Sequence, residues 1–196
     1  RPPRSTLFPY TTLFRSLQRI LAEGPLDILV NNAGGQFISA AEQITPKGFR
    51  AVMRLNLDAT WYLTTQAASL SMLANGYGKV ACITMTPSRG MPGMTHSSAS
   101  RAAVESLVRT WAAEWASRGV RTVAVAPGIV HTEAMERYGI DPAQVATVVP
   151  AGRLQTPQEV AELVAFCAAP AGDYITGTTL VADGGLNVSA PSPLQA

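Results

Sequence analysis

The 196-residue sequence has few charged residues, only two cysteines and no long apolar run. Charged residues make up 14% of the chain and hydrophobic residues 47%, so the chain can bury a sizeable core and does not have the composition of a disordered protein. A membrane-spanning helix needs about 18 consecutive apolar residues, and no stretch reaches that length. We therefore expect one globular domain without a membrane span.

Cysteine is too scarce to form a disulfide framework. Cys82 and Cys167 lie in separate apolar segments. We expect both to be buried, reduced thiols, with a disulfide or a reactive thiol as the alternative. This use of cysteine favours a cytoplasmic protein.

The excess of basic residues is confined to the start of the chain. The formal net charge is +2, but residues 1–16 hold three arginines and no acid. Residues 17–196 therefore carry 12 basic residues against 13 acidic ones. Because nucleic-acid binding requires a basic face, we expect no nucleic-acid partner.

Residues 1–16 do not match the rest of the chain. Residues 6–16 read TLFPYTTLFRS and show neither helical nor strand periodicity that continues into the segments after them. All eleven residues resemble the conceptual translation of a common high-throughput sequencing adapter. We interpret residues 1–16 as a foreign or artefactual tail, with an ordinary disordered tail as the alternative, and residues 17–196 as a single truncated domain.

Short apolar runs alternate with helical patterns from residue 17 onward. Continuous apolar runs are typical of parallel strands buried on both faces, and they predict strands at residues 26–30, 79–84, 120–126 and 178–182. Because helical segments separate them, we predict an α/β fold with a doubly wound parallel sheet. Ligands bind beyond the carboxyl ends of such strands, here just after Val30, Thr84 and Ala126.

Helix signals lie between the predicted strands. A cap and a proline at residues 45–46 predict a helical segment to about residue 73, as two helices that meet near Asn56. Residues 98–117 form a long helix whose apolar stripe carries two tryptophans, which indicates packing in the core or at a subunit interface. Other helical segments are predicted at residues 17–22, 129–149 and 156–168, the last with a capping box.

Small and polar residues come directly after two of the predicted strands. Asn31-Asn32-Ala33-Gly34-Gly35 comes after the first, and Pro127 to Thr132 comes after the third. Further along, residues 175–177 read ITG and residues 183–185 read DGG. Each segment alone is also typical of an ordinary turn.

The order and spacing of these segments, with Asn56 between them, resemble the short-chain dehydrogenase/reductase family. Residues 31–34 are similar to its NNAG motif, and residues 127–132 to its PG-x-V-x-T segment. The resemblance implies a Rossmann-like fold, hydride transfer with NAD(H) or NADP(H), a small-molecule substrate, no metal, and a homo-oligomer (dimer or tetramer) at full length. It implies cofactor contacts from Asn31, Asn32, Ala33, Gly34, Arg101, Pro127, Gly128, Val130 and Thr132.

The family's glycine-rich loop, G-x-x-x-G-x-G, is not found before Asn31. In the family, that loop brings the pyrophosphate to a helix N-terminus. We therefore expect the C-terminal part of the sheet, with the N-terminal strands of the cofactor half missing and nicotinamide dinucleotides bound poorly. We also expect the strand at residues 26–30 to form an exposed sheet edge.

The family's catalytic positions carry other residues here. Its Y-x-x-x-K falls on Ser97 and Arg101, and its Ser falls on Thr84, with Thr86 and Ser88 nearby. Arg101 keeps the positive charge and could hold the ribose, but a guanidinium does not readily transfer protons. A serine hydroxyl is a far poorer acid than a phenol. The catalytic candidates are Asn56, Thr84, Ser97 and Arg101, and a degenerate or misaligned site is the alternative.

Residues 32–39 and 96–104 resemble the trans-2-enoyl-CoA and 2,4-dienoyl-CoA reductase branch, whose members also lack the tyrosine at this position. Reduction of an enoyl thioester produces an enolate, which needs hydrogen-bond donors and a cation more than a phenol. We therefore favour hydride transfer to an enoyl thioester or a related unsaturated carbonyl. An alcohol dehydrogenase acting on an apolar, terpenoid-like alcohol, or a non-catalytic binding or assembly module, is the alternative.

Two further features concern the substrate. Alcohol oxidation needs a base, for which His96, in a polar loop, is the nearest candidate, while His131 is expected to be exposed. Residues 129–149 lie where the family keeps its mobile substrate lid. There, Met135, Tyr138 and Ile140 either line an apolar pocket or pack in the core.

Overall fold

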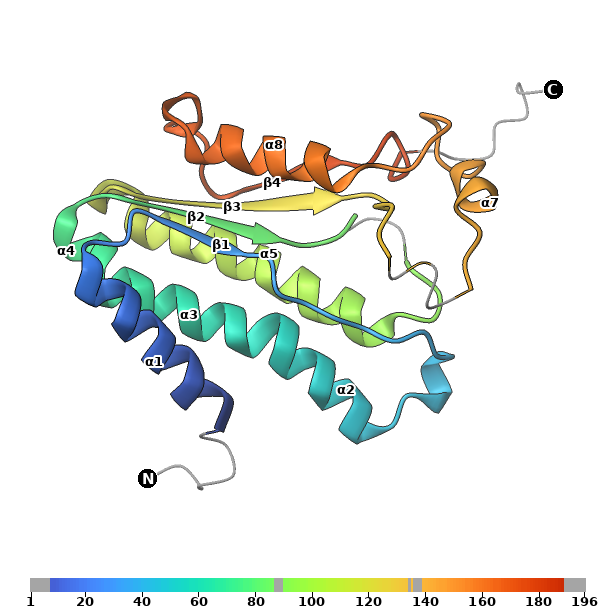
Figure 1. Ribbon diagram of the computed structural model, residues 1–196, viewed down its shortest axis with the longest axis horizontal. Coiled ribbons are helices and arrows are strands. Elements are labelled where there is room, and N and C mark those ends of the chain that lie inside the picture. Colours follow the sequence, from blue (N-terminus) through green and yellow to red (C-terminus); the bar gives the residue numbers. More distant parts are fainter. Residues whose placement is uncertain (1–7, 87–89, 134, 136–138, 189–196) are drawn as a thin grey trace.

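A computed structural model describes residues 8–86, 90–133, 135 and 139–188. Four parallel strands form one sheet in the order β1-β2-β3-β4. Helices α1, α3 and α5 cover one face of this sheet, and α8 covers the other (Figure 1). The predicted α/β fold with a parallel sheet is therefore confirmed. The strands are β1 (Ile28–Asn31), β2 (Gly78–Ile83), β3 (Val120–Pro127) and β4 (Thr178–Ala182).

Helices α5 and α8 lie close to their predicted positions, and short turns of 3-10 and π geometry separate several of the helices. The α-helices are α1 (Phe8–Glu23), α2 (Pro46–Met53), α3 (Ala59–Ala67), α4 (Leu73–Asn75), α5 (Thr95–Trp115), α7 (Pro142–Ala146) and α8 (Pro157–Ala168). The other helical turns are η2 (Ala41–Gln43), η3 (Arg54–Asp58), η4 (Ala68–Met72), η5 (Ala116–Arg118) and η6 (Pro170–Gly172).

The prediction that β1 is an edge strand is confirmed, but the prediction that it is buried on both faces is wrong. Ile28 and Val30 are 42% and 43% exposed, because α8 covers the sheet farther along, over β2 and β3. On the opposite face, Leu29 packs against the core under α1 and α5. Apolar composition indicated a strand with two covered faces, yet only one face of β1 is covered.

The start of the chain departs from expectation. Helix α1 begins at Phe8, inside the segment for which no helical periodicity was expected. Leu17 is buried in the core and Leu21 packs against it, so one turn of α1 is anchored and the helix can propagate from it. Pro9 is tolerated because its missing N–H falls in the first turn, where no helical partner exists. The foreign origin of residues 1–16 stays a prediction.

Two helical predictions need correction. The segment after Thr45 is one continuous helical run rather than two helices meeting near Asn56, because π turns η3 and η4 keep it unbroken to Asn75. Residues 129–149 do not form one long helix: Val130 pairs with Gln155 in a parallel bridge, and α7 starts only after the cap at Asp141.

The core lies on both faces of the sheet. On the α5 face, Trp111 and Trp115 stack with ring centroids 5.6 Å apart, which confirms that the tryptophan stripe packs inward. Cys82 and Cys167 are buried free thiols, as predicted. Burial raises the pKa of the Cys82 thiol to about 12, so it stays protonated. Within the described residues, no helix is both long and apolar enough to cross a membrane.

Gly119, between α5 and β3, provides a test of the fold. Its φ is +83°, and an added Cβ would lie 1.8 Å from the Gly76 carbonyl oxygen. Gly76 has a φ of +64° with nothing within 4 Å of its added Cβ, so it is a matched control for backbone strain alone. Gly76→Ala should lower the free energy of unfolding by about 1 kcal/mol, and Gly119→Ala by roughly twice that or more. Urea denaturation measures both, and equal losses would contradict the steric argument.

Candidate active site

A cavity of about 620 Å³ lies at the carboxyl ends of β1, β2 and β3, where the sequence predicted the ligand site. One part of its wall is polar, with Asn32, Gln36, Thr84 and Arg101. Another part is apolar and comes from the segments around α7 and before α5. The predicted cofactor residues that line the cavity are Asn32, Gly34, Arg101, Pro127, Gly128, Val130 and Thr132.

Arg101 joins several parts of this site. Its Nη1 donates hydrogen bonds to the carbonyl oxygens of Ile83 (2.9 Å) and Thr84 (3.3 Å) at the end of β2. Burial lowers the pKa of Arg101 from its ordinary value. An added Cβ at Gly34 would lie 2.9 Å from Nη2, so glycine lets the loop after β1 approach the guanidinium closely. Backbone carbonyls at the end of β2 therefore hold the cation, and no carboxylate among the described residues forms an ion pair with it.

Ser97 lies behind the cavity rather than in its wall. It is fully buried, and its hydroxyl donates to Gln36 Oε1 at 2.8 Å while accepting from Arg101 Nε at 3.4 Å. Gln36, which does line the cavity, was not among the predicted site residues. The signal that could have identified it was a polar amide directly after two glycines at a strand end.

Asn56 also acts from behind the wall. Its Oδ1 accepts from the Gly35 amide (2.9 Å), and its Nδ2 donates to Ser100 Oγ (3.1 Å) on α5. Its position in the π turn η3 aims it toward both partners, and such turns are frequent at functional sites. Asn56 therefore holds the loop after β1 against α5.

Asn31 points into the protein, where its Nδ2 donates to Thr64 Oγ1 at 2.9 Å. Neither Asn31 nor Ala33 is part of the cavity wall. Their predicted cofactor contacts therefore have no counterpart in this wall. The motif supplies the wall with Asn32 and Gly34, while Asn31 stabilises the end of β1.

Two threonines in the segment just after β2 line the site. The Thr84 hydroxyl donates to the carbonyl oxygen of Val125 at 3.3 Å, and Thr86 donates to that of Pro127 at 3.2 Å. Both residues line the cavity, and the assignment of the family's serine position to Thr84 stays a prediction. Ser88 lies outside the described residues.

His96 is not in a polar loop, as was expected, but in the first turn of α5. Its side chain is fully buried, and its ring packs edge-to-face against that of Phe37 with the ring centroids 4.2 Å apart. It is not part of the cavity wall, so it is not placed to act as a base there. His131 is exposed, as predicted.

The residues of the expected lid segment were predicted either to line an apolar pocket or to pack in the core, and the structure shows both. Met135 is buried against Val149 and Leu154, and it also lines the cavity, as does Ile140. Tyr138 lies outside the described residues. The remaining apolar lining comes from Ile38, Ile83, Met85, Met91, Met94, Ile129 and Val145.

Comparisons with known proteins point to one family. The profile of a family described as Enoyl-(Acyl carrier protein) reductase matches residues 10–187. A probable 2,4-dienoyl-CoA reductase of Bacillus subtilis is 40% identical over 174 residues, which cover 86% of this chain and 68% of that protein. A 3-oxoacyl-(acyl-carrier-protein) reductase of Synechocystis is 38% identical over 163 residues, covering 82% of this chain and 65% of the relative.

Solved structures show the same fold. A gluconate 5-dehydrogenase from Burkholderia cenocepacia, in complex with NADP and tartrate, superposes with a TM-score of 0.85 at 31% identity. The match covers 92% of this chain and 72% of that one. The chain belongs to the short-chain dehydrogenase/reductase family, a family of oxidoreductases with a Rossmann-like fold. It spans about two thirds of the two sequence relatives named above.

A buried acid lies beneath the site. Glu105, one turn after Arg101 in α5, is only 6% exposed, and its Oε1 has no hydrogen-bond partner among the described residues. Burial raises the pKa of its carboxyl group above the ordinary 4.5. The hydroxyls of Thr84 and Thr179 and the charge of Arg109 oppose this rise without cancelling it. Glu105 is therefore easier to protonate in the folded chain than in the unfolded one.

This shift predicts a pH-dependent stability. As the pH rises above 4.5, the unfolded state releases the Glu105 proton first, so the free energy of unfolding falls. Glu105→Gln should remove this loss, so its stability relative to wild type should be greater at about pH 8 than at about pH 4. Glu114→Gln, on an exposed position of the same helix, is the control. A Glu105→Gln difference that stays constant with pH, measured by urea denaturation, would refute the shift.

Proposed function

We propose that the protein is a nicotinamide-dependent reductase that transfers hydride to an enoyl thioester or a related unsaturated carbonyl. The observation that carries the proposal is the composition of the polar wall. It holds the fixed Arg101 cation, at the position of the family's lysine, together with Gln36 and Thr84, while Ser97, at the position of the family's tyrosine, lies behind the wall. The naming of the Bacillus relative as a dienoyl-CoA reductase supports it. NADP in two solved relatives supports the cofactor class.

The residues present fit the nicotinamide half of the cofactor. The wall offers the Arg101 cation and the polar side chains of Asn32 and Thr132 for a ribose and a carboxamide, beside the apolar faces of Pro127 and Val130. When bound, NAD(H) or NADP(H) supplies or accepts the hydride. We propose that this chain alone holds little of the adenosine and pyrophosphate end.

The side chains around the substrate oxygen suit an enolate. Addition of hydride to the β-carbon leaves negative charge on the thioester oxygen, which donors and a nearby cation stabilise. We assign donation to the Gln36 amide, whose nitrogen carries two N–H groups, and to the Thr84 hydroxyl, which would turn from the Val125 carbonyl oxygen to reach the substrate. Ser97 orients Gln36, Arg101 supplies the positive charge, and solvent can protonate the carbon afterwards.

The apolar wall suits an acyl chain. Met91, Met94 and Met135 are unbranched and adaptable, so they can surround alkyl chains of different length. A polyhydroxylated substrate would leave its hydroxyl groups unpaired against these side chains. This favours an apolar thioester over a sugar acid such as gluconate, which a structural relative's name indicates.

Reduction of a ketone or oxidation of an alcohol is the second candidate, favoured by the 3-oxoacyl reductases among the relatives. Alcohol oxidation, whether of a terpenoid-like or another apolar alcohol, requires a base at the hydroxyl. Burial of His96 away from the cavity removes the nearest candidate. A non-catalytic binding or assembly module is the third possibility.

We also propose a cytoplasmic homo-oligomer. A shallow groove of about 510 Å³ lies between the helical run η3–α3 and α5, lined by Leu57, Trp61 and Leu107. Trp61 is 45% exposed, and an exposed aromatic side chain in an apolar groove is typical of a subunit contact.

The function is tested by comparing substrates. The longest product of the gene, with the 196-residue chain beside it, is assayed for NADPH and NADH oxidation with a 2-enoyl thioester and a 3-oxoacyl thioester, and for NAD(P)+ reduction with a terpenoid alcohol. We expect turnover with the enoyl thioester, and weak nucleotide binding by the 196-residue chain in calorimetry. Turnover of the alcohol or the ketone alone would replace the proposal with the second candidate, and no turnover would favour the binding module.

Gln36 provides a sharper test of the site. Gln36→Leu should lower kcat/KM for the enoyl thioester by about 100-fold, because it removes a hydrogen bond that strengthens as negative charge develops. Ser97→Ala should have a smaller effect, about tenfold, because Gln36 remains but loses its fixed orientation. Gln158→Leu, at an exposed position of α8, is the control for the loss of an amide. An unchanged kcat/KM in Gln36→Leu would exclude Gln36 from catalysis.

A further inference from the structure

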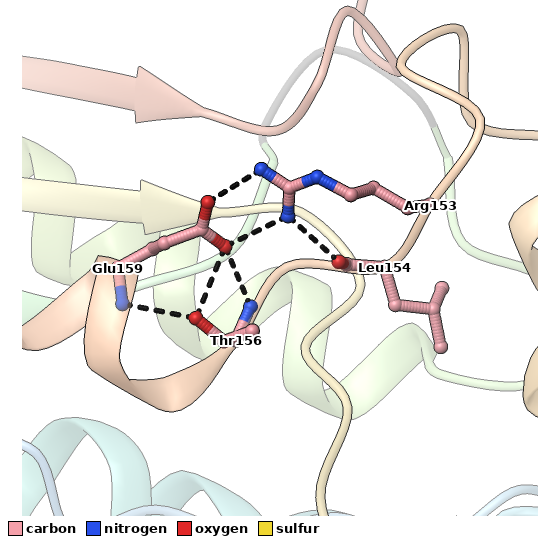
Figure 2. Close-up of polar contacts among 4 residues, drawn as sticks. All are labelled: Arg153, Leu154, Thr156 and Glu159. Atoms are coloured by element: carbon pink, nitrogen blue, oxygen red, sulfur yellow. Dashed lines mark hydrogen bonds and ion pairs between the residues drawn. The ribbon is translucent and has the colours of Figure 1, made fainter.

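An exposed arginine fork lies outside the cavity, before α8. Arg153 Nη1 contacts Glu159 Oε2 at 2.9 Å and Nη2 contacts Oε1 at 2.5 Å, so the pair is bidentate (Figure 2). Nη1 also donates to the carbonyl oxygen of Leu154 at 3.2 Å. Two-point contacts of this kind restrict orientation as well as adding attraction.

The Glu159 carboxylate also caps the N-terminus of α8. Glu159 Oε2 accepts from the Thr156 amide at 2.8 Å, and the Glu159 amide donates to Thr156 Oγ1 at 3.2 Å (Figure 2). This is the capping box that the sequence predicted. The short stretch from Leu154 to Thr156 is therefore held at both ends by one ion pair.

The residue between these two ends contacts the cavity wall. The Gln155 amide donates to the Ile129 carbonyl oxygen at 3.0 Å, and its own carbonyl oxygen accepts from the His131 amide at 2.8 Å. These two bonds form the parallel bridge with Val130, which lines the cavity. A displacement of Gln155 would therefore move Val130.

Leu154 connects the same stretch to the apolar part of the cavity wall. It is buried against Met135 and Val149, and Met135 lines the apolar part of the cavity. The backbone stretch held by the ion pair thus supports both the proposed nicotinamide side and the proposed acyl side of the site.

We propose that Arg153, through its fork on Glu159, is a positioning residue that sets the place of the Val130–Thr132 turn and thereby the affinity for the nicotinamide nucleotide. Arg153 touches no residue proposed to react, and it acts through Leu154 and Gln155. The effect is local, because an exposed ion pair contributes little to global stability. The kinetic part of this inference rests on the proposed function.

Hydrogen exchange tests the positioning without any need for activity. Arg153→Met keeps most of the side-chain length and removes the fork, and Glu159→Gln keeps a capping side chain and removes the charge. In each, the amides of His131 and Gln155 should exchange about fivefold to tenfold faster than in wild type, with little change in global unfolding. Glu162→Gln, which alters the 3.3 Å contact between Gln158 and Glu162 on the same helix, should leave both amides unchanged. Unchanged exchange in both of these variants would overturn the proposal, and if Arg153→Met fails to fold, unchanged exchange in Glu159→Gln is enough to overturn it.

Kinetics tests the consequence for the site. KM for the nucleotide should rise about fivefold in Arg153→Met with kcat within about twofold of wild type, and Arg153→Lys should recover part of the loss. Faster amide exchange with an unchanged nucleotide KM would overturn the link to the site. No turnover by the wild-type protein would instead refute the proposed function, and the exchange measurement would still decide whether Arg153 positions the turn.

Discussion

The contact of the Arg101 guanidinium with the end of β2 is the interaction on which the site depends. Two backbone carbonyls, at Ile83 and Thr84, hold the cation where the parallel strands end. Glycine at position 34 lets the loop after β1 close over it, and Ser97 links it to Gln36. Because the guanidinium is fixed by backbone, its position is set by the sheet itself, and the polar wall is built around it.

This arrangement has a chemical consequence. A guanidinium cannot easily give up a proton, and the hydroxyl of Ser97 is both buried and already bonded. The wall can therefore stabilise negative charge on an oxygen much better than it can remove a proton from an alcohol. This physical limit disfavours alcohol oxidation, independently of the names of relatives.

The agreement between sequence and structure depends on the range of the interactions involved. Strand positions, the Thr45 and Thr156 caps and the tryptophan stripe depend on neighbouring residues, and they were predicted correctly. The run after Thr45 was expected to break near Asn56, yet π turns absorb the irregularity without ending the helix. Helix α1 begins earlier than its periodicity suggested, because Leu17 is anchored on the rest of the molecule.

In the site, too, some features follow from the local sequence and others from the tertiary structure. Apolar patterning and short motifs were enough to establish the fold class, the family and which segments come after the strands, because each of these is recorded locally in the sequence. The folded arrangement was needed to decide which side chains reach the cavity: Gln36 is in its wall, Ser97 and Asn56 are behind it, and His96 is buried away from it. The direction of a side chain depends on packing between elements distant along the chain, and no local pattern in the sequence records that packing.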